Sequence, residues 1–261
     1  MNILSIDWDY FINATASERF SLFPDGGNEN LEMGVLAFVW VSRYADAILS
    51  AEFSGKGRVI SDIGVLDTEL DALYSILGVH CSSGVDMAVS ESHKDIVRFI
   101  DEFYERDGEP VNVFNIDFHH DSYDHNGKDI DCGNWVRRLK DAGKINAVTW
   151  VRRDDSEDGD AMEVFETLYS IADLHDSRLI QEDGIDAIFV CRSGAWSPLH
   201  LDDAFVKMLD SIQAEVCCGY NVISDVPLRW NDYIRDKIDG MVEGTREFHV
   251  LNRARKAEGE S

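Results

Sequence analysis

The segment Asn115–Asp121 reads Asn-Ile-Asp-Phe-His-His-Asp and closes the apolar run Val111–Ile116. Side chains alternate along an extended segment, so Asp117, His119 and Asp121 are predicted to project from one face. Two buried carboxylates repel each other and lose solvation unless a cation neutralises them. Mixed oxygen and nitrogen ligands suit Mn²⁺, Fe²⁺ or Zn²⁺ better than Ca²⁺. The segment therefore predicts a metal site and makes the protein a candidate metalloenzyme.

A second acid pair, Asp7 and Asp9, directly follows the apolar run Asn2–Ile6. The two carboxylates are predicted to share one face of the chain, as Asp117 and Asp121 do. Two such pairs can hold two metal ions with carboxylates bridging between them. The alternative is a strand-to-turn junction at which the aspartates cap the following helix.

His93 lies in the segment Ser90–Asp95, at a predicted junction between a loop and a helix, before the strand that leads to Asp117. One further nitrogen ligand would complete a two-metal site of two histidines and four aspartates. The alternative is an ordinary surface or capping histidine at the start of a helix.

The elements that must position these residues are predicted from hydrophobic patterning. Apolar runs predict strands at Asn2–Ile6, Arg58–Ser61, Val111–Ile116, Ala147–Val151, Ala187–Val190 and, more weakly, Glu215–Cys218. Helical periodicity occupies Asn30–Phe53, Leu66–Leu77, Ser92–Tyr104, Ala161–Ile171 and His200–Gln213. This alternation favours a three-layer, doubly wound α/β domain with a mostly parallel sheet over 1–261, in which 253–261 form a flexible tail. Ligands in such a fold bind beyond the carboxyl ends of the strands, where both acid pairs are expected.

The chain of 261 residues carries 24 basic and 50 acidic residues, a formal net charge of −26. Such a charge repels nucleic acid and anionic membranes and favours cationic partners, although solubility or adaptation to salt explains it more simply. No apolar run reaches the roughly 18 residues of a membrane span, and there is no basic leader, so we expect a cytoplasmic protein. Five cysteines without C-x-x-C spacing predict neither a disulfide framework nor a thiolate zinc site.

Asp117-Phe118-His119-His120-Asp121 resembles the Asp-Ala-His-x-Asp signature of the arginase, or ureohydrolase, superfamily. In that superfamily, a second Asp-x-Asp and an upstream histidine in a Gly-Gly-Asp-His turn complete a binuclear manganese site. Asp7-Trp8-Asp9 resembles the Asp-x-Asp, and His93 resembles the upstream histidine. The resemblance therefore implies two Mn²⁺ ions bound by Asp7, Asp9, His93, Asp117, His119 and Asp121.

The chain departs from classical arginases in three ways. Its Asp-x-Asp precedes the Asp-x-His-x-Asp, as if the fold were permuted, and the glycines before His93 are absent. Cys132–Trp135 resembles the Ser-Gly-Asn loop that touches the amino-acid end of the substrate, but no proton-shuttling histidine follows it, so His120 or His125 would substitute. With Asp7–Phe11 and Cys191–Pro198, the chain is most similar to the divergent branch that includes peptide arginases.

Peptide arginases convert arginine side chains within a precursor peptide to ornithine, so the resemblance implies an arginine-containing peptide, or free arginine, as the substrate. Two divalent ions lower the pKa of a shared water, which attacks the guanidinium carbon. A histidine, His120 in this interpretation, supplies a proton to the departing amine. The candidate substrate-binding residues are Asn134, Asp62, Arg192 and Trp196. The structural alternatives are a helix cap for Asp62, an ion pair for Arg192 and a core position for Trp196.

Three other interpretations of the sequence remain open. Tandem His119-His120 is also similar to zinc deacetylases of this fold, although Asp121 and the Asp7/Asp9 pair favour two metals over one. A haloacid dehalogenase-type phosphatase would use Asp7/Asp9 as nucleophile and acid beside Mg²⁺. It would also require a strand-end Ser/Thr, a lysine and a late acidic pair, for which Asp154-Asp155 is available. A non-catalytic binding protein could hold a basic partner on its acidic surface. Family arginases are often oligomers, so an oligomer is compatible with the resemblance.

Overall fold

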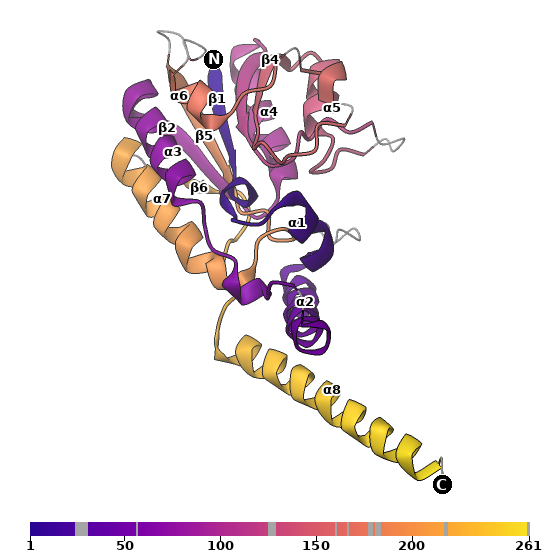
Figure 1. The fold of residues 1–261 in the computed structure, drawn as a ribbon. Coiled ribbons are helices and arrows are strands. Elements are labelled where there is room, and N and C mark those ends of the chain that lie inside the picture. The colour runs from indigo at the N-terminus through magenta and orange to yellow at the C-terminus, as the bar shows by residue number, and fades with distance from the viewer. Residues whose placement is uncertain are drawn as a thin grey trace.

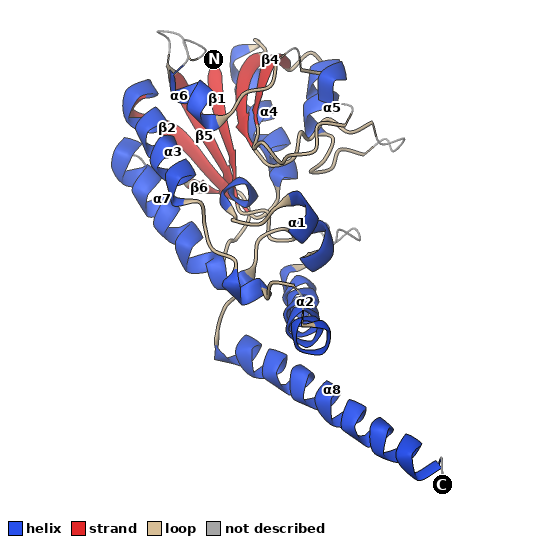
Figure 2. Ribbon diagram, in the orientation of Figure 1, coloured by secondary structure: helices blue, strands red, loops and turns tan. Residues whose placement is uncertain are grey.

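The computed structural model describes residues 1–23, 31–55, 57–124, 129–159, 161–165, 167–176, 180, 184–216 and 219–259. Within these residues, six parallel strands form one sheet in the order β4-β3-β1-β5-β2-β6 (Figures 1 and 2). The strands are β1 (Asn2–Asp7), β2 (Cys81–Ser90), β3 (Val111–Ile116), β4 (Ile145–Val151), β5 (Ile185–Cys191) and β6 (Asn221–Val222). The predicted α/β class is confirmed, and the described sheet is parallel throughout.

Helices flank this sheet, and several short 3-10 helices follow its strands. The α-helices are α1 (Ala16–Leu22), α2 (Met33–Ser54), α3 (Asp67–His80), α4 (Ile96–Asp107), α5 (Trp135–Asp141), α6 (Ile171–Asp176), α7 (Asp202–Val216) and α8 (Asp232–Gly259). The 3-10 helices are η1 (Trp8–Phe11), η3 (Ile60–Asp62), η4 (His93–Asp95), η5 (Ala161–Glu163) and η6 (Leu199–Leu201).

Two hydrophobic clusters on opposite faces of the sheet make the domain three-layered. On β1, Ile3 joins the cluster that contains the apolar faces of α4 and α5. Its neighbours Leu4 and Ile6 join the cluster that contains the apolar faces of α3 and α7. This alternation follows from the period of two along a strand, and both faces of the parallel sheet are buried as a result.

Helix α4 shows how the local sequence specifies one of these layers. Ile96, Phe99, Ile100 and Phe103 recur at the spacing of a single helical face, and all four are buried. Gly108 ends the helix with a φ of 73°, a left-handed conformation that glycine adopts without steric cost. Because α4 begins directly after η4, its packing against the sheet fixes the position of the preceding turn.

The predicted elements agree with the structure best where the apolar pattern is strong. β3 has the predicted bounds, and β1, β4 and β5 extend the predicted strands slightly. Helices α2, α3, α4 and α7 lie where helical periodicity predicts them.

Three predicted elements are wrong. Arg58–Ser61 is not a strand: η3 begins at Ile60, and this short apolar run buries Ile60 in a turn. Glu215–Val216 end helix α7, while 217–218 lie outside the described residues. The predicted helix over Ala161–Ile171 is reduced to η5 and the first residue of α6.

Strand β2 was not predicted, because the first half of its sequence is polar and exposed. Its buried second half, Met87–Ser90, lies between β5 and β6. Residues 253–259 of the expected flexible tail form the end of α8, whose backbone is helical to Gly259.

Helix α8 extends away from the sheet and packs against α2 (Figure 1). Within α2, Gly34–Ser54 is long and apolar enough to cross a membrane by length and composition alone, and 44% of the tested window is buried in the protein. The core helices of soluble proteins meet the same criterion, so this is only a weak indication of a span. In this structure Arg43, on that helix, is buried and donates a hydrogen bond to the Ala195 carbonyl oxygen at 2.6 Å.

Candidate metal centre

The predicted ligands meet at the carboxyl edge of the sheet. Asp7 ends β1 and Asp117 follows β3, and these neighbouring strands pair in parallel register, so the two carboxylates lie side by side. Strand β2 ends at Ser90, and η4 carries His93 back over the same edge. The site thus draws on three strands that are distant in sequence, as expected for a ligand site in an open parallel sheet.

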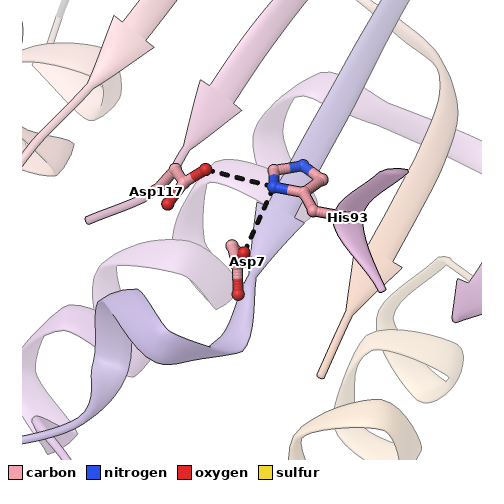
Figure 3. A group of neighbouring side chains, drawn as sticks. All are labelled: Asp7, His93 and Asp117. Atoms are coloured by element: carbon pink, nitrogen blue, oxygen red, sulfur yellow. Dashed lines mark ion pairs between the residues drawn. The ribbon is translucent and has the colours of Figure 1, made fainter. Parts of the chain in front are cut away.

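His93 is the centre of a first cluster (Figure 3). Its side chain is only 1% exposed, and its Nδ1 atom lies 3.1 Å from Asp7 Oδ2, 3.1 Å from Asp117 Oδ2 and 2.9 Å from Asp121 Oδ2. On the other side of the ring, Nε2 lies 2.8 Å from the Ser5 hydroxyl. The serine fixes the ring orientation and leaves Nδ1 directed at the carboxylates, which is the usual arrangement around a metal-binding histidine.

A second cluster is formed by Asp9, Asp117 and His119. The Nδ1 atom of His119 lies 3.1 Å from Asp9 Oδ2 and 3.9 Å from Asp117 Oδ1. In this cluster, as in the Asp7–His93–Asp117 group, the three ligand atoms lie within 4.8 Å of one another. Asp117 belongs to both groups, and its two oxygens point to different histidines.

The loop after β3 corrects one prediction. Asp117, His119 and Asp121 do not project from one face of a strand, because β3 ends at Ile116 and the chain turns. The His119 backbone N–H donates to Asp117 Oδ1 at 2.8 Å, and Asp121 has a φ of 50°, in the left-handed region. The Trp135 indole N–H donates to Asp121 Oδ2 at 2.6 Å and holds that carboxylate against His93.

The donor set fits a cation better than it fits a proton. A single imidazole N–H can donate one good hydrogen bond, yet three carboxylate oxygens surround His93 Nδ1 at 2.9–3.1 Å. His93 Nδ1 and Asp9 Oδ1 are buried and form no hydrogen bond of acceptable geometry. Buried polar atoms of this kind require a partner, and a divalent ion supplies one to oxygen and nitrogen donors together.

Burial and mutual repulsion oppose the charges of Asp7 and Asp117, whereas His119 and Arg19 outweigh burial at Asp9 and lower its pKa. Burial, with the Asp9 and Asp117 carboxylates, raises the pKa of Asp7 to about 6. Burial and Asp121 raise the pKa of Asp117 to about 7. Burial acts to lower the pKa of His119, but Asp9 outweighs it and raises that pKa to about 9. The carboxylates and the imidazoles thus favour each other's charged forms, and the carboxylates favour positive charge beside them.

A cavity of about 380 Å³ opens beside the two clusters. Its aromatic wall consists of Phe20, Phe23, Phe118, Tyr123 and Trp196, and the acidic residues Asp131 and Glu157 also line it. Asp7, His93, His119 and Asp121 lie on its floor. The candidate metal centre is thus open to a ligand from one side.

Of the predicted substrate-binding residues, Trp196 lines this cavity, with its ring 5.1 Å from that of His119. Asn134 does not line it, because its side chain is buried within its own loop. Its Nδ2 donates to the Asp129 carbonyl oxygen at 3.2 Å, and its Oδ1 accepts from the Asp131 N–H at 3.0 Å. Asn134 shapes the loop, and the adjacent Gly133 faces the cavity.

Asp62 and Arg192 are both away from the cavity. Asp62 is exposed on η3, and its carbonyl oxygen accepts from Arg58. Arg192 is buried and pairs with Glu91, its Nε donating to Oε2 at 2.7 Å. The structural alternative for Arg192, an internal ion pair, is the one that the structure contains.

His120 is fully buried behind the cavity wall and does not line it. The Ser122 backbone N–H donates to its Nδ1 at 3.1 Å, and the Ser122 hydroxyl lies 2.8 Å from the same atom. Its ring lies 3.9 Å from the ring of Tyr123, which does line the cavity. His125, the other predicted proton carrier, lies outside the described residues.

Two residues that contact Asp7 and Asp9 were not predicted from the sequence. The Ser193 hydroxyl donates to Asp7 Oδ2 at 2.5 Å. The Nη1 atom of Arg19 lies 3.4 Å from Asp9 Oδ2, and its Nη2 donates to the Asp9 carbonyl oxygen at 2.5 Å. Ser193 follows the end of β5, so the strand-end rule that indicates Asp7 could also have indicated it. No sequence pattern indicates Arg19, because it lies on helix α1, which was not predicted.

Of the parts that the phosphatase alternative requires, a strand-end serine is present, because Ser193 follows β5 and donates to Asp7, but the lysine and the late acidic pair are not found at the cavity among the described residues. No lysine lines the cavity in the described part of the chain. Asp155 belongs to the late acidic pair of the phosphatase alternative. Its carboxylate accepts from the Ala16 N–H at 3.1 Å and pairs with Arg153.

Comparisons of the chain with protein-family profiles, with curated proteins and with solved structures give no match. The buried Asp/His clusters in a parallel α/β fold therefore stand as the basis for a functional proposal.

Proposed function

We propose that this protein is a hydrolase with two divalent metal ions that releases urea from a guanidinium group. The observation that carries the proposal is the position of Asp117, which belongs to both Asp/His clusters and offers one oxygen to each histidine. A carboxylate placed in this way is suited to bridge two ions. Mn²⁺ is the proposed ion, because its preferences match a set of two imidazoles and several carboxylates.

In this proposal Asp7, His93, Asp117 and Asp121 hold one ion, and Asp9, Asp117 and His119 hold the other. Two such ions supply a water of lowered pKa that can act as a nucleophile at neutral pH. The overall reaction adds one water to the guanidinium and gives urea and a primary amine. In this proposal the cavity residues would position the guanidinium carbon above the centre.

The walls of the cavity favour a cationic group. The acidic residues Asp131 and Glu157 line the cavity, and a planar guanidinium binds carboxylates through paired hydrogen bonds. Tyr123 and Trp196 offer aromatic faces, which attract cations. His120 does not line this cavity, and its ring packs against that of Tyr123, which does.

An arginine within a peptide is the favoured substrate, with free arginine as the alternative. Arg19 is the one arginine or lysine that lines the cavity among the described residues, and it is buried with its guanidinium on Asp9 and the Ile12 carbonyl oxygen. It is therefore not available to bind a free α-carboxylate. A peptide bond removes that carboxylate and the need to neutralise it.

The resemblance to the arginase superfamily supports the same proposal. The order of the motifs, Asp7-x-Asp9 before Asp117-x-His119-x-Asp121, departs from that of classical arginases. Because the motifs follow the ends of two adjacent parallel strands, their order along the chain does not prevent the residues from meeting at one edge of the sheet.

The first experiment measures manganese by elemental analysis, in wild-type protein and in the Asp117→Ala, Asp121→Ala double variant. About two Mn²⁺ per chain are expected in the wild type and almost none in the variant, since the substitutions remove ligands from both clusters. Urea release is then assayed with arginine, with an arginyl peptide and with the corresponding lysyl peptide.

Asp62→Asn is the matched control, because it removes an exposed carboxylate away from the cavity and should retain both ions and full activity. Equal manganese in the double variant and the wild type would overturn the proposed centre. Two ions with no urea from either arginine substrate would preserve the metal centre but exclude the proposed reaction.

A further inference from the structure

The turn after β5 is held by a buried group of charges that does not face the cavity. Arg192 donates from Nε to Glu91 Oε2 at 2.7 Å and from Nη1 to the Pro227 carbonyl oxygen at 2.6 Å. Arg229 pairs with Asp202 at 2.6 Å and donates to the Gly194 carbonyl oxygen at 3.0 Å. Glu91 comes directly after β2, so these contacts join the ends of two neighbouring strands.

Backbone contacts fix the same turn closely. Ser193 has a φ of 50°, a conformation that residues other than glycine rarely adopt. At Gly194 there is no room for a side chain, since an added Cβ would lie 1.7 Å from Glu91 Oε1. The Trp196 N–H donates to the Ser193 carbonyl oxygen at 2.8 Å and closes the turn. A strained residue held this firmly often has a functional role, and the direction of its side chain indicates which one.

The Ser193 side chain points at the metal centre. Its hydroxyl donates to Asp7 Oδ2 at 2.5 Å, and the same oxygen lies 3.1 Å from His93 Nδ1. Both Ser193 and Asp7 are buried, with exposed fractions of 7% and 3%. A hydroxyl proton can occupy one lone pair of the carboxylate oxygen and so direct the remaining lone pairs towards a shared ion.

We propose that Ser193 is a positioning residue for Asp7, and that the Glu91–Arg192 pair serves this role by holding the turn from which Ser193 reaches the ligand. This inference rests on the metal centre of the proposed function. It also assigns a purpose to Arg192 other than substrate binding. A merely structural hydroxyl would affect folding, whereas a positioning hydroxyl affects the affinity of the centre for metal.

The strained backbone at Ser193 provides a test that separates these two roles. Ser193→Gly removes the hydroxyl and relieves the strain, whereas Ser193→Ala removes the hydroxyl and keeps the strain. We expect both variants to bind Mn²⁺ about 10-fold or more weakly than the wild type, by titration calorimetry of protein first stripped of metal. In the metal-free state, Ser193→Gly should unfold at a higher temperature than Ser193→Ala, so metal affinity and fold stability would change independently.

Each outcome bears directly on the inference. Manganese affinities equal to that of the wild type in both variants would overturn it, as would affinities that follow the unfolding temperatures. Wild-type protein that binds no Mn²⁺ would overturn the metal centre itself and this inference with it. If the wild type binds two ions and both Ser193 variants bind Mn²⁺ with the same affinity as the wild type, only the role of Ser193 is overturned.

Discussion

At the scale of single residues, Asp117 connects the two halves of the candidate centre. Its Oδ2 lies 3.1 Å from His93 Nδ1, and its Oδ1 lies 3.9 Å from His119 Nδ1. Asn115 Nδ2 donates to Oδ2 at 3.2 Å, and the His119 N–H donates to Oδ1. Each oxygen thus has one fixed donor, which holds the carboxylate plane between the two imidazoles.

Asp117→Asn and Asp9→Asn are therefore expected to differ in how many ions they lose. Asp117→Asn should lower the affinity for both ions by about 100-fold or more, whereas Asp9→Asn should retain about one Mn²⁺ per chain. Elemental analysis after dialysis, together with Mn²⁺ titration, measures both quantities. Retention of one ion by Asp117→Asn would show that this carboxylate does not bridge.

At the scale of elements, His200 on η6 connects this short helix to helix α2 and to the residue that follows η3. It lies on η6, its Nε2 donates to the Ile63 carbonyl oxygen at 2.8 Å, and its Nδ1 lies 2.5 Å from the hydroxyl of Tyr44 on α2. These contacts suit the neutral ring, in which Nε2 donates to the Ile63 carbonyl oxygen and Nδ1 accepts from the Tyr44 hydroxyl. Burial lowers the pKa of His200 below its ordinary value of 6.5.

A histidine whose pKa is lower in the folded state contributes stability that is fully present above the unfolded value of 6.5. This contribution is lost as the pH falls from 6.5 through the lower folded-state pKa. We expect the free energy of unfolding of the wild type to fall more steeply between about pH 7 and pH 5 than that of His200→Gln. At pH 8, His200→Gln should be less stable by about 1–3 kcal/mol, because buried hydrogen bonds are lost. Urea unfolding at each pH measures both effects, and parallel pH profiles would contradict the assignment.

At the scale of the whole molecule, the candidate centre joins segments that lie far apart in the chain. Asp7, His93 and Asp117 come from β1, η4 and the loop after β3, and Ser193 adds the turn after β5. A metal bound by all of these segments can bind only the folded chain at full affinity, so its binding free energy adds to the stability of the fold.

Removal of metal is therefore expected to lower the unfolding temperature. At Mn²⁺ concentrations of about 100 times Kd, the stabilisation of one site amounts to about 2.7 kcal/mol. Calorimetric scans with Mn²⁺ and with chelator should differ by several degrees in wild type and in Asp62→Asn, but not in the Asp117→Ala, Asp121→Ala variant. A chelator shift of the same size in the double variant would assign the effect to metal bound elsewhere.

The net charge of −26 also acts on the whole molecule, because its field attracts cationic substrates. We expect kcat/KM for an arginyl peptide to fall as NaCl rises from about 50 to 500 mM, with kcat nearly constant, since salt screens long-range attraction. A neutral peptide with one arginine should show a smaller fall than a peptide with additional lysines. Equal salt dependence for both would exclude electrostatic steering.

The sequence by itself determined the types of the candidate ligands and the strands that they follow. The apolar runs that become β1 and β3 specify buried parallel strands, and acids directly beyond such strands must lie at the ligand-binding edge of the sheet. Asp7, Asp9, Asp117, His119 and Asp121 could therefore be predicted from local order alone.

Only the tertiary structure decided which other residues belong to the site. Asp62 and Arg192 share the polar character of site residues, yet one is exposed on η3 and the other is paired internally with Glu91. Ser193 contacts Asp7 across 186 positions of sequence. Such contacts depend on the order of strands in the sheet and on the paths of the connecting segments. Local hydrophobic periodicity does not encode either, because it specifies which face of an element is buried but not which element covers it.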